Sequence, residues 1–111
     1  MEIKKEKLTI KFKNIREIRM GSPYQVCEIS FKGEWIPPLP DYDWQDIKAI
    51  SPDKNQIALV RWNTLGNIPG FHIIRINVEK KSYHKTRKII GICKKIYWKD
   101  GKFIWEKNKT D

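Results

Sequence analysis

The chain reads ISPDKNQIALVRW over residues 50–62, and this stretch decides the fold. Residues 51–55 carry strong turn chemistry, because Pro presets φ while Asp and Asn bond back to their own backbone or accept left-handed angles. A β-rich run over residues 57–62 follows at once, and a second over residues 71–78 follows a break with two glycines and a proline. We expect these two strands to form a central pair that the other strands extend or cover.

Three further strands are predicted before the central pair. Residues 7–13 alternate apolar side chains with lysines, which is typical of a half-buried strand with a lysine-covered outer face. Residues 24–32 are β-rich, but their apolar parity slips between Val26 and Cys27, which favours a β-bulge or burial on both faces. A short strand over residues 44–50 leads into the central turn.

The clearest hairpin signal is the Asp-Gly pair at residues 100–101. Asp-Gly supplies the positive φ angles of a type I′ turn, and a two-residue turn fixes the register of both strands. In that register Trp98 faces Phe103 and Ile96 faces Trp105, so these side chains form a cross-strand ladder.

Together these patterns predict one all-β domain over residues 1–111. We expect one antiparallel meander sheet folded on itself, or a small β-sandwich, with about six to eight strands and blade-like hairpins. Another strand is predicted over residues 82–90, and the tail over residues 107–111 is expected to fray. Open sheet edges are compatible with a monomer or with an edge-paired dimer.

The net charge of +10 is distributed unevenly. Residues 1–20 carry seven Lys or Arg against three acidic side chains, residues 21–60 carry three against six, and residues 61–111 carry thirteen against four. The chain is therefore a basic protein with an acidic middle, which bears on its partners.

Location and redox state follow from three patterns. No apolar run approaches the ~20 residues of a membrane helix, and the N-terminus has no apolar core of a signal peptide. Cys27 and Cys93 lie far apart without metal-ligand spacing. We therefore expect a cytoplasmic protein with two buried thiols rather than a disulfide, and no membrane association.

Signals for catalysis are weak. His72 lies mid-strand between apolar residues, which favours a structural role. His84 lies among lysines and an arginine and suits phosphodiester chemistry only if Glu28, Glu34 or His72 lies nearby as a second acid or base. No cofactor or metal is expected, because the acidic run over residues 41–46 lacks the glycine of a calcium loop and no phosphate-binding glycine motif is present.

Two surfaces are candidates for binding. The proline-rich, aromatic and acidic loop is typical of a rigid recognition loop, since prolines limit the entropy lost on docking and Trp and Tyr dominate interface hot spots. Its candidate partner-binding residues are Trp35, Tyr42, Asp43, Trp44 and Asp46.

The second candidate surface combines lysines with interleaved aromatic residues, the pattern of phosphate contacts plus base stacking. Its candidate nucleic-acid-binding residues are Lys85, Arg87, Lys88, Lys94, Lys95 and Trp98.

Residues 50–105 resemble a β-propeller blade of the TolB or WD40 kind. The likeness rests on the Ser-Pro-Asp-Lys-Asn turn at residues 51–55, the strands over residues 57–60 and 71–78, and the charged turn over residues 79–81. A closed propeller needs typically four or more blades, so the resemblance implies a blade-like antiparallel meander and no closed ring.

In size and composition the whole chain resembles small immunity proteins of bacterial toxin systems. This resemblance implies a non-enzymatic inhibitor that plugs a toxin's active site, with the acidic segment 35–53 presenting carboxylates. We therefore expect an intracellular protein-binding or inhibitory module that neutralises a toxin by direct complex formation. The alternative is a basic single-domain nucleic-acid-binding protein, and a weaker alternative is a nuclease that uses His84.

Overall fold

The computed structural model describes residues 8–17, 25–63 and 68–108. These residues form strands and connecting loops without a helix, which confirms the predicted all-β antiparallel class. The nine strands are β1 (Leu8–Glu17), β2 (Gln25–Gly33), β3 (Trp44–Ile50), β4 (Gln56–Asn63), β5 (Gly70–Asn77), β6 (Ser82–Lys85), β7 (Ile89–Ile90), β8 (Ile92–Lys99) and β9 (Lys102–Asn108). Of the tail that was predicted to fray, residues 107–108 belong to β9 and the rest lies outside the described residues.

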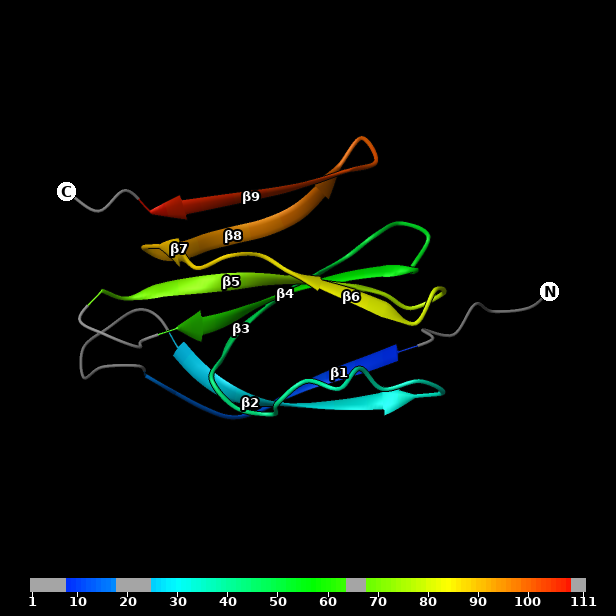
Figure 1. Ribbon diagram of the computed structural model, residues 1–111, viewed down its shortest axis with the longest axis horizontal. Helices are drawn as coiled ribbons and strands as arrows, with labels where there is room; N and C mark the ends of the chain where they lie inside the picture. Colours follow the sequence, from blue (N-terminus) through cyan, green and yellow to red (C-terminus); the bar gives the residue numbers. More distant parts are fainter. Residues whose placement is uncertain (1–7, 18–24, 64–67, 109–111) are drawn as a thin grey trace.

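The strands form three layers (Figure 1). One seven-stranded sheet has the order β1-β2-β3-β4-β5-β6, with β7 also paired to β5, and β8 and β9 form a separate two-stranded sheet. The ribbon of β1 and β2 lies below the central strands in Figure 1, and the hairpin of β8 and β9 lies above them. The predicted folding of the sheet on itself arises where β1 and β2 cover one face of the central strands.

Each face of the central strands has its own core. The ribbon cluster joins β4 and β5 to the ribbon of β1 and β2, and it contains Leu8, Ile10, Cys27, Ile29, Trp44, Ile57, Leu59, Ile74, Ile76 and Val78. The hairpin cluster joins the opposite face to β8 and contains Ala49, Ala58, Val60, Phe71, Ile73, Cys93 and Ile96. Burial on both faces explains why residues 57–60 are continuously apolar rather than alternating.

The central pair forms as predicted. β4 and β5 pair without a break, from Gln56 opposite Asn77 to Asn63 opposite Gly70. A long uninterrupted ladder between two strands buried on both faces makes this pair the structural centre of the molecule.

The turn before β4 is held by its own side chains. Asp53 Oδ1 accepts hydrogen bonds from Ser51 Oγ at 2.6 Å and from the Asn55 amide at 3.0 Å. These hydrogen bonds lower the pKa of Asp53 below its ordinary value, and the hydrogen bond from Ser51 has the largest effect. Gln56 N donates to Ser51 Oγ at 3.0 Å, and Lys54 takes a left-handed φ of 63°.

The apolar slip in β2 has two structural counterparts. Val26 and Cys27 are both buried, so β2 is covered on both faces at this point. A register shift between β1 and β2 lies opposite, between Lys13 and Arg16, where Asn14 has a φ of 51°. The irregularity was predicted from the apolar pattern of β2, whereas the one extra residue belongs to β1.

The strand predicted over residues 82–90 is interrupted at residues 86–88, which separate β6 from β7. Both pieces pair with β5. Thr86 bridges the interruption, because its amide donates to Ile73 O at 3.1 Å and its Oγ1 accepts from the Ile73 amide at 2.9 Å.

The β8–β9 hairpin has the predicted register. Trp98 pairs with Phe103 at a ring-centroid distance of 5.0 Å, and Ile96 pairs with Trp105. Residues 100 and 101 have φ angles of 51° and 76°, the two positive values that the Asp-Gly turn requires.

The two cysteines are free and buried. Cys27 belongs to the ribbon cluster and Cys93 to the hairpin cluster, so they lie on opposite faces of the central strands. Burial raises the pKa of each thiol to about 11, which leaves little reactive thiolate at neutral pH.

Candidate functional site

Two of the five residues predicted to bind a partner have aromatic rings that are covered by the protein itself. Trp44 is 0% exposed, and its Nε1 donates to Pro40 O at 2.9 Å. Trp35 is half-buried and packs against the ribbon cluster. Trp44 is therefore a core residue that no partner can touch in this conformation, and its function is to fix the loop that precedes it.

The other loop residues remain accessible to different degrees. Tyr42 is 54% exposed and Asp43 is exposed, whereas Asp46 is half-buried on β3. Burial of the Cys27 thiol is the main cause of its raised pKa, and the negative charge of Asp46 is the second cause. Of the five predicted partner-binding residues, Tyr42 and Asp43 are thus the most accessible.

Arg61 is the residue that organises this region, and sequence reasoning missed it. Its guanidinium carbon lies 5.0 Å from the Tyr42 ring centroid and 6.0 Å from that of Trp44. Its Nε donates to Tyr42 O at 3.2 Å. Arg61 is the one charged residue of β4, and a lone charge in an otherwise uncharged strand was the signal available in the sequence.

A polar cavity of about 350 Å³ opens beside Arg61. It joins the end of the loop, the end of β4, the middle of β5 and the last residue of β6. Its lining residues are Tyr42, Asp43, Arg61, Trp62, Asn63, His72 and Lys85. The cavity therefore brings together two residues of the predicted partner-binding set and one of the predicted nucleic-acid-binding set.

His72 supports one wall of this cavity through both ring nitrogens. Its Nδ1 lies 2.8 Å from Thr86 O, and because a carbonyl only accepts, Nδ1 carries the proton. Its Nε2 lies 2.9 Å from Asn63 Nδ2 and accepts from that amide. With both nitrogens engaged, His72 is a structural residue.

His84 lies away from the groups that a nuclease would need. His84 pairs with Arg75 and so shares its sheet face. His72 lies on the same face as Ile74 and its partner Lys85. Adjacent strand positions face opposite sides of a sheet, so the two histidines lie on opposite faces. Glu28 accepts a hydrogen bond from Asn14 in the β1–β2 ribbon, and Glu34 lines a separate hollow with Trp35 and Lys81.

The predicted nucleic-acid-binding residues are divided among several surfaces. Lys85 lines the polar cavity, while Arg87 and Lys88 lie between β6 and β7, where Lys88 Nζ donates to Ile68 O at 2.6 Å. Trp98 packs into the hairpin cluster against Phe103.

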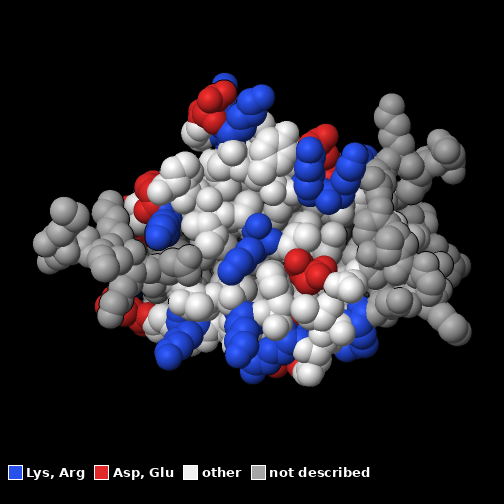
Figure 2. Space-filling view, turned by 180° about the vertical axis from the view of Figure 1, so that it is seen from behind, with Lys and Arg blue, Asp and Glu red and all other residues white. Residues whose placement is uncertain are grey.

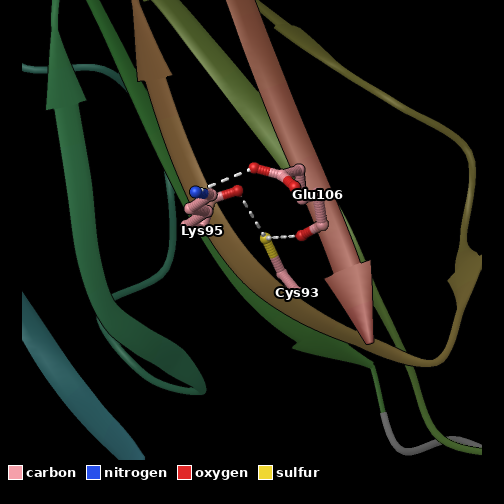
Figure 3. Close-up of polar contacts among 3 residues, drawn as sticks. All are labelled: Cys93, Lys95 and Glu106. Carbon is pink, nitrogen blue, oxygen red and sulfur yellow. Dashed lines mark hydrogen bonds and ion pairs between the residues drawn. The ribbon is translucent and has the colours of Figure 1, made fainter. Parts of the chain in front are cut away.

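Lys94 and Lys95 lie exposed on β8, and the aromatic ring beside Lys95 is that of Tyr97. Figure 3 shows Lys95 paired across the hairpin with Glu106, at 3.1 Å. This pair raises the pKa of Lys95 and lowers that of Glu106. Beside it, the Cys93 thiol points to the carbonyls of Lys95 and Glu106, each at 3.7 Å.

Positive charge does not form one continuous basic surface on the face seen in Figure 2. Lys and Arg side chains there are separated by acidic and uncharged residues, and they are densest along the lower border, at the level of β1 and β2. That border lies away from the hairpin on which the sequence placed part of its nucleic-acid surface.

Two kinds of feature are absent from the described part of the chain. Within residues 8–17, 25–63 and 68–108, no three His, Cys, Asp or Glu side chains come together as metal ligands would. The same residues contain no helix of sufficient length and apolarity to cross a membrane.

A scan against protein-family models finds no match, and the curated proteins and the solved structures likewise contain no match to this chain.

Proposed function

We propose that this chain is a non-catalytic protein-binding module that engages its partner around the polar cavity. The observation that carries the proposal is Arg61, which lies over the rings of Tyr42 and Trp44 and donates a hydrogen bond to the loop backbone. Arginine and aromatic residues dominate the energetics of protein interfaces, especially where they are already ordered before binding.

The loop that carries Tyr42 is attached to strands on both sides. Asp41 O accepts from the Ile29 amide of β2 at 2.9 Å, and Asp43 O accepts from the Trp62 amide of β4 at 2.7 Å. A loop held in this way loses little conformational entropy on binding. This rigidity supports the inhibitory form of the proposal, an immunity protein whose acidic loop occupies the basic active site of a toxin.

The charge arrangement supports a protein rather than a nucleic acid as the partner. The cavity combines Arg61 and Lys85 with Asp43, so it presents both signs of charge. A backbone-binding groove for single-stranded nucleic acid needs a continuous positive track with stacked aromatics. On the hairpin, Lys95 is paired with Glu106, so positive and negative charge lie side by side there too.

The test is capture followed by reconstitution. Wild-type protein and an Arg61→Glu variant are immobilised side by side and exposed to a nuclease-treated extract of the source cells. A protein retained by the wild type alone is purified and titrated calorimetrically. We expect a one-to-one complex that survives about 0.3 M salt, where exposed charge pairs are screened beyond a few ångströms.

Two results together would contradict the proposal. The wild type and Arg61→Glu would retain the same proteins, and purified wild type would bind mixed single- and double-stranded nucleic acid with an affinity that falls steeply with salt. That result would move the function to the nucleic-acid class.

A further inference from the structure

The edge formed by β6 is open in the described part of the chain. β6 pairs with β5 on one side, and no described strand pairs with its other side. All four of its residues are exposed, including Tyr83 at 42%. Edge strands present unpaired backbone groups that accept an added strand.

Hydrogen bonds on either side of β5 show which β6 groups point outward. Val78 N donates to Asn55 O on the β4 side, and Thr86 N donates to Ile73 O on the β6 side. In an antiparallel ladder the bonded positions alternate along each strand. His84 therefore bonds toward β5, while Tyr83 and Lys85 direct their N–H and C=O groups away from the sheet.

A hollow lies on each face of this edge. On one face Lys85 reaches the polar cavity that also contains Arg61. On the other face an open hollow of about 230 Å³ is lined by Arg75, Ser82 and His84 among others. A strand added beside β6 would direct its side chains alternately toward these two hollows.

The charge of the edge identifies what fits there. Residues 75–88 contain six Lys or Arg and one Glu. A second copy of this chain would bring the same positive edge against itself, which like-charge repulsion opposes. An extended segment with carboxylates on the face of Lys85 complements the positive charge of this edge.

We propose that the edge of β6 receives an extended acidic segment of the partner protein by strand addition, with its alternate carboxylates directed toward Lys85 and the polar cavity. This proposal rests on the proposed protein-binding function and specifies one contact of the partner, an acidic segment at β6 that is separate from the basic site facing the loop of Tyr42 and Asp43. In this mode, backbone hydrogen bonds to Tyr83 and Lys85 supply affinity, and the side-chain hollows supply specificity.

The first test uses a capped hexapeptide of alternating glutamate and valine, titrated into isotope-labelled protein and followed by NMR. We expect the amides of Tyr83 and Lys85 to shift and to exchange more slowly with solvent. The His84 amide, already bonded to β5, should keep its exchange rate. Two control peptides replace glutamate by lysine, or carry N-methyl groups on alternate residues.

Removing the peptide's backbone donors should weaken binding about tenfold, the effect of losing two or more hydrogen bonds of ordinary net strength. The lysine peptide should produce no shift at the β6 edge. Equal binding of the N-methylated or lysine peptide, or no perturbation of Tyr83 and Lys85 at millimolar peptide, overturns the proposal.

A matched pair of variants tests the same edge in the protein. Tyr83→Pro deletes an outward N–H that β5 does not use, a position where edge strands tolerate proline. Tyr83→Ala removes the ring and keeps the N–H. We expect Tyr83→Pro to weaken peptide binding about tenfold and Tyr83→Ala to stay within about threefold. Unchanged amide resonances of Ala58 and Leu59 on β4, two strands away from Tyr83, verify the fold of each variant.

The partner protein separates the two proposals. If Arg61→Ala abolishes its binding while Tyr83→Pro binds like wild type, strand addition is overturned and the proposed function stands. If Tyr83→Pro and Arg61→Ala both weaken the complex and Tyr83→Ala does not, both proposals are supported.

Discussion

Among the described residues, two cations lie over tyrosine rings at nearly the same distance, but their surroundings differ. Arg61 lies 5.0 Å from the Tyr42 ring centroid, and Lys95 lies 5.2 Å from that of Tyr97. Arg61 is half-buried and bonded to a loop carbonyl beside a cavity. Lys95 projects from the hairpin with 54% of its side chain exposed and is paired with Glu106.

The comparison shows that a cation beside an aromatic ring is not by itself a binding site. The order around Arg61 comes from residues of three separate segments, so its geometry is fixed before any partner arrives. The order around Lys95 comes from one hairpin whose cation is already satisfied. Preorganised groups contribute more to binding than groups that must be ordered on contact.

The largest expected effect concerns the residue beneath Arg61. Trp44→Ala removes a fully buried ring from the ribbon cluster and should destabilise the fold by about 3–5 kcal/mol. Tyr97→Ala on the hairpin should cost about 1 kcal/mol or less, since Tyr97 is only half-buried. Chemical denaturation of both variants measures the difference. Similar costs would show that the two sites are supported equally.

The two histidines give the next comparison. His72→Ala breaks hydrogen bonds to Thr86 and Asn63 beside the cavity and should cost about 1–3 kcal/mol. His84→Ala removes an exposed side chain and should change stability by no more than about 0.5 kcal/mol. Nitrogen NMR should find His72 with its proton on Nδ1. A proton on Nε2 would contradict the hydrogen-bond assignment.

The turns at Gly101 and Lys54 each contain a residue with a positive φ, so glycine can be removed from one and introduced into the other. Gly101 has a φ of 76° with open space around its α-carbon, so Gly101→Ala should cost about 1 kcal/mol through backbone conformation alone. Lys54 has a φ of 63°, so Lys54→Gly relieves the same backbone strain. The glycine also raises the conformational entropy of the unfolded chain, which partly offsets this stabilisation. Its net effect should lie between zero and about 1 kcal/mol of stabilisation. Thermal unfolding measures both, and destabilisation by Lys54→Gly would contradict the turn geometry.

The smallest effect is expected at the hairpin ion pair. Lys95→Ala should leave the melting temperature unchanged within error at neutral pH, because exposed ion pairs are screened by solvent. The Lys95 hydrogen bond lowers the pKa of Glu106, so any contribution is present above the ordinary carboxylate pKa. It disappears as the pH falls through the lowered value. A clear loss of stability at pH 7 that is absent at pH 2 would show that the pair matters.

Local chemistry made much of the fold predictable. The Asp-Gly turn determined the register of β8 and β9, and the Ser-Pro-Asp turn placed the start of β4. These features depend on backbone preferences of a few adjacent residues. These turns do not depend on which residues pack against either face of the sheet.

The candidate site was less predictable because it depends on contacts between distant segments. Aromatic residues in a proline-rich loop gave no indication that Trp44 turns inward to Pro40 O while Tyr42 stays outside. Nor did the sequence pair Arg61 with Tyr42, nineteen positions away. The lysines and Trp98 were placed on one surface by their proximity along the chain, yet alternation on β8 directs Trp98 to the core.

The most direct test of the account compares the two cation sites on the same complex. The purified partner is titrated calorimetrically with wild type, Arg61→Ala and Lys95→Ala at one salt concentration. We expect a loss of about 2 kcal/mol or more for Arg61→Ala, the size expected of an interface hot spot, and an affinity unchanged within error for Lys95→Ala. A larger loss for Lys95→Ala than for Arg61→Ala would contradict this expectation and place the binding surface on the hairpin.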